Sequence, residues 1–238
     1  MLYRNQFLGL AALGLVLCLA STPLFAADTE EGFTSIFDGK TLEGWDGDPK
    51  LWSVEDGALT GQTSADDPIR HNSFLIYRKD EPGDFELRFK FRMVGGNSGV
   101  QFRSVEVDKW VISGYQGDFD STNRYTGILY EEKGRGILAK RGLKTTINED
   151  GSKEVTGKTV DEKTIVESYN NEDWNDFTVI AKGNQITEIL NGNVTVEVTD
   201  NQKEKRRMKG LIAFQIHQGP PMKIQFKDVR IKKPEDGS

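Results

Sequence analysis

An amide and an imidazole share one face of an apolar stretch near the C-terminus. In AFQIHQGPP (213–221), apolar and polar residues alternate as in a β-strand, so Gln215 and His217 lie on the face opposite Phe214 and Ile216. The chain holds only two histidines. An imidazole titrates near neutral pH and can take up or release a proton there. The pair is therefore a candidate for proton transfer beside a hydrogen-bonding amide.

Two other stretches present polar pairs with the same spacing. GVQFRS places Gln101 and Arg103 on one face, and GYQGDFD does the same for Gln116 and Asp118. If all three stretches belong to one sheet, these side chains form a polar surface suited to hydrogen-bonding hydroxyl groups. The alternative is a face that only meets water, as one face of an antiparallel sheet often does.

The elements that would position these pairs are short strands. FELRFKFRM (85–93) alternates strictly, with apolar residues on one face and charged residues on the other. Similar runs follow, separated by turn signals such as Gly219-Pro220-Pro221. The pattern predicts an all-β fold, a two-sheet antiparallel β-sandwich of the jelly-roll type. Strands are expected over residues 85–93, 99–104, 177–183, 185–192, 194–198, 210–218 and 222–232.

A polar stretch over residues 144–172 interrupts this rhythm. It has few large apolar residues, and it is long for a connector inside a compact domain. We expect a large loop on the rim of the sandwich, with room for a short strand or helical turn.

The first 27 residues have the pattern of a signal peptide. Arg4 precedes the apolar run LGLAALGLVLCLA, and small residues follow, ending at Ala26 and Ala27. The run is shorter than the roughly 20 residues that a membrane span needs. We expect a secreted or periplasmic protein with no membrane attachment after cleavage, and a single β-sandwich domain over residues 28–238. Cys18, the only cysteine, lies in the leader, so no disulfide is expected in the mature chain.

The composition argues against several classes of partner and cofactor. The formal net charge is −6, whereas a nucleic-acid partner needs a basic surface. The sequence has no Gly-rich phosphate loop, HExxH motif or cysteine cluster. The acids Asp46, Asp48, Glu55 and Asp56 offer calcium ligands, but their spacing does not match an EF-hand loop, and solvated turns are the simpler interpretation. We expect no cofactor, with a divalent metal such as calcium left open.

Longer motifs extend over most of the chain. Between about residues 33 and 232 it contains, in this order, FTSIFDGKTLEGW, LWSVEDGALTGQ, GNSGVQFRS, SGYQGDFD, TGILYEEKGRGILA and GLIAFQIHQGPPMKIQFKDVRIK. Together these motifs resemble the 3-keto-disaccharide hydrolase family. The resemblance implies a concanavalin A-like sandwich whose concave sheet holds sugar, and action on glycosides already oxidised at C3. It carries the motif positions over to Asn97, Gln101, Arg103, Gln116, Asp118, Tyr130, Glu132, Arg135, Gln215 and His217.

The implied chemistry is β-elimination, with a lyase or a net hydrolase outcome. A C3 ketone acidifies the C2–H bond, and the enolate formed by its deprotonation can expel the C1 substituent. This sequence of steps needs a base, a stabiliser for the enolate oxygen and an acid for the leaving group. We expect His217 or Asp118 to act as base or acid. Arg103 would stabilise the oxygen, and Glu132 completes the catalytic set. Many relatives carry Glu-Val-Gln at residues 116–118, so here a base role would pass to Asp118.

The expected partner is a carbohydrate, and two other hypotheses compete with an enzyme. A carbohydrate-binding module of the cell envelope would use the same polar sheet without catalysis. It would stack sugars on Trp45, Trp52, Trp110 or Tyr115, of which Trp110 is the best placed. A structural domain of the envelope would have a polar surface that only meets water. The predicted substrate contacts are Asn97, Gln101, Gln116, Tyr130, Arg135, Gln215 and Trp110.

Overall fold

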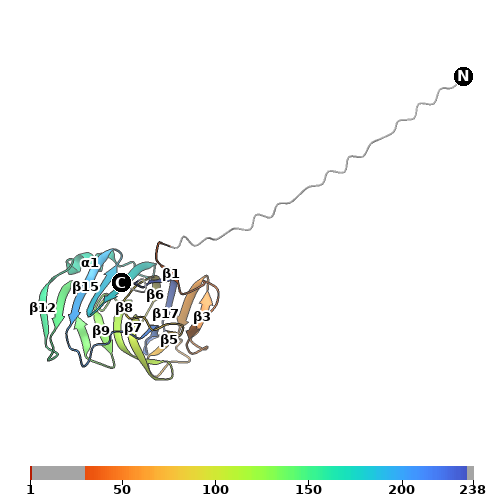
Figure 1. Ribbon diagram of the computed structural model, residues 1–238. Coiled ribbons are helices and arrows are strands. Elements are labelled where there is room, and N and C mark those ends of the chain that lie inside the picture. The colour runs from red at the N-terminus through yellow and green to blue at the C-terminus, as the bar shows by residue number, and fades with distance from the viewer. Residues whose placement is uncertain (2–29, 235–238) are drawn as a thin grey trace.

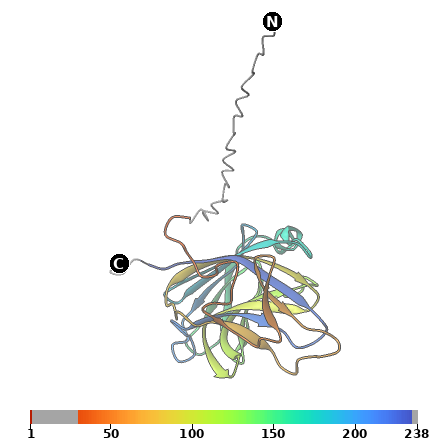
Figure 2. The same cartoon turned by 90° about the vertical axis from the view of Figure 1, so that its right-hand side faces the viewer.

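Two stacked β-sheets make up the described part of the chain (Figure 1, Figure 2). The computed structural model describes Met1 and residues 30–234. The signal peptide expected over residues 1–27 lies outside the described residues except for Met1. Within the described residues, no helix has the length and apolar character that crossing a membrane requires.

Each sheet is built from strands that are distant in the sequence. One sheet has, in spatial order, β12 (Lys153–Lys158), β11 (Leu143–Ile147), β15 (Asn193–Asp200), β14 (Gln185–Leu190), β13 (Asn175–Lys182), β6 (Phe85–Val94), β17 (Lys223–Lys232), β4 (Ala58–Gln62) and β3 (Trp52–Glu55), with β1 (Thr34–Ser35) paired to β17. The other has β10 (Gly136–Ala139), β9 (Leu129–Glu132), β8 (Val111–Asp120), β7 (Asn97–Asp108), β16 (Leu211–Ile216), β5 (Ser73–Tyr77) and β2 (Trp45–Asp46). Neighbouring strands are antiparallel except β11 and β15, which run parallel. The predicted two-sheet antiparallel sandwich is confirmed.

Period-two alternation builds the core between the sheets. Every second residue of β6 is buried, and the residues between them remain partly exposed. Aromatic rings then stack across the layer: the centroids of Phe214 and Phe226 lie 3.8 Å apart, and those of Phe91 and Phe119 lie 4.1 Å apart. Each such ring buries a large apolar area, which is the dominant favourable contribution to folding.

Three of the four aromatic side chains considered as sugar platforms lie in this core. Trp45, Trp52 and Tyr115 expose only 6%, 2% and 1% of their surface. The indole Nε1 of Trp45 donates to the carbonyl of Ile36 at 2.8 Å. The prediction that these rings are available to stack a sugar is wrong, because protein atoms already cover them.

Trp110 is also engaged by the protein itself. It lies at the tip of the β7–β8 hairpin, which folds over the outer face of its own sheet. The Trp110 carbonyl accepts from the Phe74 N–H, and its Nε1 donates to Asp46, both at 3.0 Å. Lys109 lies 4.1 Å from the ring centroid. The ring packs on a small apolar cluster of Phe74, Ile76, Ile112 and Ala213. Trp110 therefore anchors the hairpin tip, and it is not among the residues that line the cavity described below.

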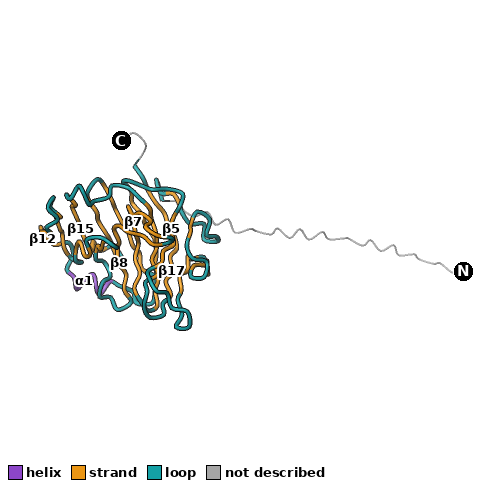
Figure 3. The backbone as a smooth tube through the Cα atoms, turned by 90° about the horizontal axis from the view of Figure 1, so that it is seen from below, coloured by secondary structure: helices purple, strands orange, loops and turns teal. Residues whose placement is uncertain are grey.

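The segment over residues 144–172 is not the expected rim loop. It forms most of β11, all of the edge strand β12, and helix α1 (Glu162–Ser168) at the β12–β15 end of the molecule (Figure 3). Alternation buries Thr145 and Ile147 in the core, and Ile165 attaches the helix to it. The parallel pairing of β11 with β15 lets a few apolar residues support a strand in a largely polar segment.

Candidate functional site

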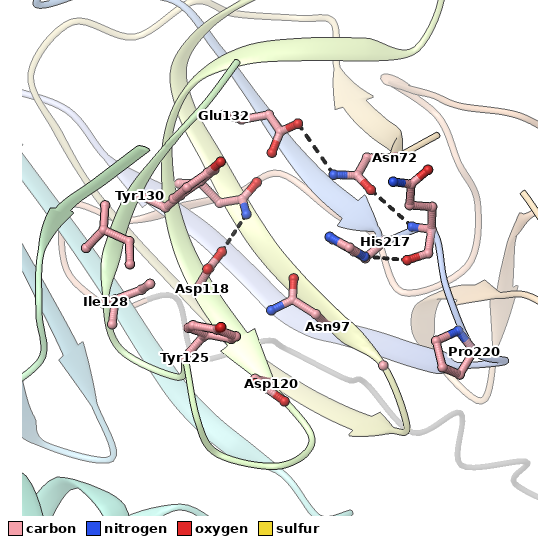
Figure 4. A pocket seen from close by; sticks show the side chains of 14 residues that line it. Asn72, Asn97, Asp118, Asp120, Tyr125, Ile128, Tyr130, Glu132, His217 and Pro220 are labelled. Carbon is pink, nitrogen blue, oxygen red and sulfur yellow. Dashed lines mark hydrogen bonds between the residues drawn. The ribbon is translucent and has the colours of Figure 1, made fainter. Parts of the chain in front are cut away.

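A cavity of about 590 Å³ opens on the outer face of the seven-stranded sheet (Figure 4). Strands β9, β8, β7 and β16 lie side by side beneath it. Side chains at alternate positions of these strands point into it, and the loops at one end of the sheet supply the remainder. Its lining residues are Asn72, Gly96, Asn97, Gln116, Asp118, Asp120, Tyr125, Ile128, Tyr130, Glu132, Ile137, His217, Gln218 and Pro220.

The predicted face alternation holds for most of the polar residues. Gln116 and Asp118 point into the cavity from β8, and Phe119 points into the core. Gly99 on β7 lies opposite Asp118 and leaves room for the neighbouring amide, because a Cβ at Gly99 would lie 2.7 Å from Cγ of Gln116. The structure thus brings together six predicted site residues: Asn97, Gln116, Asp118, Tyr130, Glu132 and His217. Their roles remain predictions.

Asp118 ends a chain of hydrogen-bonded amides. Ser104 Oγ donates to Oε1 of Gln101, Nε2 of Gln101 donates to Oε1 of Gln116, and Nε2 of Gln116 donates to Oδ1 of Asp118. These distances are 2.7, 2.7 and 2.5 Å. Gln215 also donates to Oε1 of Gln116, at 3.1 Å. The chain fixes the orientation of each amide and of the carboxyl group at its end.

Gln101 and Gln215 lie beneath the cavity rather than in its lining. Both side chains are completely buried and hydrogen-bonded to Gln116. The prediction that they contact a substrate directly is wrong. They hold Gln116, which does reach the cavity, in place.

Burial raises the pKa of Asp118 to about 8. The hydrogen bond from Gln116 lowers this pKa, while the negative charges of Glu132 and Asp120 raise it further. The side chain exposes only 7% of its surface. A carboxyl group with such a pKa is a much stronger base than an ordinary aspartate, and near neutral pH it exchanges its proton readily.

The rim of the cavity across from Asp118 is formed by Glu132, His217 and Asn72. Asn72 Nδ2 donates to Glu132 at 3.4 Å, and Oδ1 of Asn72 accepts from the Gln218 N–H at 3.0 Å. Nδ1 of His217 lies 2.5 Å from the Gln218 carbonyl oxygen. Because a carbonyl only accepts, Nδ1 carries hydrogen and Nε2 is left for a ligand. Burial raises the pKa of Glu132, and Lys133, Asn72 and His217 lower it.

Arg103 does not share the cavity. A bulge interrupts the β7–β8 register after Phe102, and Arg103 takes a φ of 46° there. Its side chain runs to the other sheet, donating to the carbonyls of Gly83 and Gly183 at 2.9 and 2.7 Å and pairing with Asp84 at 2.9 Å. The prediction that Arg103 stabilises an enolate is wrong, because one extra residue in the strand reverses its direction.

Arg135 is likewise committed to the interior. It pairs with Glu131 and with Asp200, at 2.7 Å in each case, and Tyr115 donates to the same Asp200 carboxylate at 2.5 Å. Asp200 belongs to β15, so this buried network joins the two sheets. The prediction of Arg135 as a substrate contact is wrong.

A second buried acid lies behind Asp118. Glu188 of β14 is completely buried, and neither of its carboxylate oxygens has a hydrogen-bond partner among the described residues. It approaches Gly117 of β8, where a Cβ would lie 2.8 Å from Oε1 of Glu188. Burial, together with the charge of Asp118, raises the pKa of Glu188 well above its ordinary value. Burial without a hydrogen-bond partner therefore favours the protonated form of Glu188.

The acids considered for calcium are dispersed. Asp46 pairs with Arg78 at 2.7 Å, and Glu55 of the other sheet pairs with Lys223 at 2.7 Å. Asp48 accepts from a backbone N–H in its own turn. Across residues 30–234, no group of three or more His, Cys, Asp or Glu side chains is arranged to hold a metal ion.

Sequence reasoning missed several residues of the site, most of them in loops. Asn72 precedes β5, and Asp120 ends β8. Tyr125 and Ile128 come from the β8–β9 loop, where no alternation of apolar and polar residues predicts which way a side chain points. Only the motif positions, which the resemblance supplied, indicated that the β9 segment belongs with the polar strands.

Comparison with known proteins places the chain among sugar-related relatives. A Bacteroides thetaiotaomicron 3-keto-disaccharide hydrolase is 33% identical over 85 residues, which are 32% of this chain and 29% of that protein. The match therefore spans under a third of the curated relative.

Solved structures share the fold. Two candidate glycosyl hydrolases from Parabacteroides distasonis have TM-scores of 0.58 and 0.57, with 20% and 23% identity. The alignments cover 84% and 86% of this chain and 98% and 95% of theirs. A carbohydrate-binding module, CBM66 from Bacillus subtilis, has a TM-score of 0.52 at 14% identity and covers 80% of this chain and 96% of its own. The model of the 3-keto-alpha-glucoside-1,2-lyase-like domain matches residues 32–232. The chain belongs to this family, as its motifs predicted.

Proposed function

We propose that this protein cleaves 3-keto-glycosides by abstracting the C2 proton and eliminating the C1 substituent. Family membership supports the substrate class. The observation that carries the chemistry is a buried carboxyl group, Asp118, whose pKa is about 8 and which lines a cavity with Glu132 and His217.

Asp118 is the proposed base. It removes the proton from C2, and the C–H electrons form an enolate with the C3 ketone. The amide of Gln116 keeps the carboxyl oriented toward the cavity. Its raised pKa matches the weak acidity of a carbon next to a ketone better than an ordinary aspartate would, which favours proton transfer.

Glu132 is the proposed acid for the leaving group. The enolate collapses, the C1–O bond breaks, and a C1=C2 double bond forms. The departing oxygen takes a proton from Glu132, whose raised pKa favours the protonated form. Water added at C1, with return of the proton to C2, converts the elimination into net hydrolysis.

With Arg103 outside the site, donors of other kinds must bind the enolate oxygen. Asn97 lines the cavity with an amide that can donate hydrogen bonds, and the imidazole of His217 lines the same side. These groups take the role that the sequence predicted for the Arg103 guanidinium.

The decisive experiment compares oxidised and unoxidised substrates. We expect release of the alcohol from methyl 3-keto-glucoside, no release from methyl glucoside, and a loss of about 10²–10⁴-fold in kcat for Asp118→Asn. Below pH 8 the kcat/KM of the wild type should rise with pH, because only ionised Asp118 accepts a proton. Tight binding of plain glycans without turnover of the keto compound would instead indicate a carbohydrate-binding module.

We also propose that the protein is secreted or periplasmic, because its first 27 residues have the pattern of a signal peptide. N-terminal sequencing of protein recovered from the periplasmic or extracellular fraction tests this. A mature chain that begins at residue 27 or 28 is expected, and a chain that keeps Arg4 would contradict it.

A further inference from the structure

The cavity has two walls of different chemistry. Asn97 and His217 lie on one side of Asp118, while Tyr125, Ile128 and Tyr130 lie on the other (Figure 4). Asn72 and Gln218 extend the first side, and Ile137 extends the second. We call Tyr125, Ile128, Tyr130 and Ile137 the apolar wall.

One continuous stretch of chain builds the apolar wall. Tyr125 and Ile128 come from the β8–β9 loop, Tyr130 from β9, and Ile137 from β10. Tyr130 and Ile137 are direct partners across the β9–β10 pair, so their side chains are neighbours on one face. Arg124 stacks on the Tyr125 ring at 5.0 Å without lining the cavity.

Two members of this wall remain in contact with solvent. Tyr125 is 37% exposed and Ile137 is 40% exposed, whereas Ile128 beside them is buried and only 6% exposed. Single exposed apolar residues are common on protein surfaces. Several that adjoin one another at the mouth of a cavity indicate a surface that is covered when a ligand binds.

The charges of the cavity restrict what can cover this wall. Asp118, Asp120 and Glu132 all line it. None of the lining residues among those described is a lysine or an arginine. An anionic group would lie beside these carboxyl groups with no lysine or arginine to pair with, which argues against an anion. The apolar side chains of the wall themselves favour a neutral group over a charged one.

The position of Glu132 indicates which part of the substrate this occupant is. Glu132 and Tyr130 alternate on the same face of β9, and the charge of Glu132 acts on the Tyr130 hydroxyl. The carboxyl assigned to the leaving oxygen therefore lies between the two sides, next to Tyr130 of the apolar wall and hydrogen-bonded to Asn72 of the other side, where a bond between sugar and leaving group would lie. The other side of Asp118, formed by Asn97, His217, Asn72 and Gln218, offers amide and imidazole groups to the hydroxyls of the keto sugar.

We propose that the apolar wall is the leaving-group subsite and that it selects neutral aglycones with an alkyl or aryl ring over hydroxylated leaving groups. The inference rests on the proposed function, because a leaving group exists only if the protein cleaves the glycoside. It adds a substrate class to that function.

The test compares two alcohols of similar intrinsic leaving ability. We would measure kcat/KM for cyclohexylmethyl and for 2-hydroxyethyl 3-keto-glucoside. The wild type should favour the first, and Ile137→Ser and Tyr125→Ser should each lower this preference about five- to tenfold. Val107→Ser is the matched control, because Val107 is 53% exposed, lies on β7 and is not part of the cavity. It should leave the preference unchanged.

The outcomes separate the two proposals. If the wild type turns over neither keto compound, the proposed function fails and the subsite fails with it. Turnover of both compounds with equal kcat/KM, or with a preference that neither Ile137→Ser nor Tyr125→Ser reduces, overturns the subsite and leaves the proposed function intact. A fall in preference with Val107→Ser of the same size would also overturn it.

Discussion

Replacing Asp118 by asparagine should stabilise the protein at neutral pH while it removes activity. The carboxyl group is nearly excluded from solvent, and its pKa rises from an ordinary value of 3.8 to about 8 in the folded chain. The folded state therefore holds this proton more tightly than the unfolded state does. Stability from this group is complete below about pH 4 and is lost as the pH rises through about 8.

The size of the effect follows from the two pKa values. Their difference corresponds to about 6 kcal/mol at about 1.4 kcal/mol per pH unit. At pH 7 about three quarters of it applies, or about 4 kcal/mol. This is an upper limit, because the cavity opens to solvent. Asparagine stays neutral at every pH, and its Oδ1 can still accept from Gln116.

Urea unfolding at pH 4, 5, 6, 7 and 8 measures this effect. The free energy of unfolding of Asp118→Asn should match that of the wild type at pH 4 and exceed it by a growing amount up to pH 8. Asp66→Asn, at an exposed loop position, should follow the wild type throughout. Parallel curves for Asp118→Asn and wild type would refute the burial argument, and so would a variant that loses stability relative to wild type as the pH rises.

Three further predictions concern residues around the site. Glu188→Gln should also gain stability over wild type as the pH rises above about 4.5, because the folded chain keeps Glu188 protonated; the same urea series measures it. Arg103→Met should lower the free energy of unfolding by about 2–4 kcal/mol, since the buried guanidinium loses two hydrogen bonds to carbonyls and its pair with the partly exposed Asp84. Gly117→Ala should cost about 1–3 kcal/mol, because its Cβ would press on Glu188 and Phe177 at 2.8 and 3.1 Å.

Each of these has a distinguishing result. A pH-independent difference for Glu188→Gln would show that Glu188 is not protonated in the folded chain. Under conditions in which both proteins are folded, Arg103→Met should have the same KM as the wild type. A higher KM for the folded variant would show that Arg103 contributes to the site. Gly157→Ala is the control for Gly117→Ala, since its nearest neighbour would lie 3.5 Å away, and an equal loss in both would contradict the close contact.

The sequence predicted the strands well because their side chains alternate with a period of two. That same alternation correctly placed Gln116 and Asp118 on the outer face of β8. It failed for Arg103, because a single bulge changes the direction of a side chain and leaves no trace in the residue types. It also failed for residues 144–172, where the parallel contact with β15 is a tertiary effect.

The site itself was only partly predictable. Gln101 and Gln215 point to the predicted face of the sheet, but they are buried beneath the cavity. Their burial depends on how the neighbouring strands and the hairpin tip cover the sheet. Arg135 lies in the turn between β9 and β10, where sequence spacing does not determine the direction of a side chain. Asn72, from a loop distant in the sequence, was not considered at all, although it connects Glu132 with the segment after β16.

The folded-over tip of the β7–β8 hairpin limits how a long carbohydrate can approach. Arg78 pairs with Asp46 of β2 and with Glu106 of the hairpin, each at 2.7 Å, and so fastens the tip to the far edge of the sheet. A polysaccharide laid lengthwise across the strands would run into this barrier. The proposed cleavage is therefore expected on small glycosides, and internal cutting or processive sliding along a polymer is not.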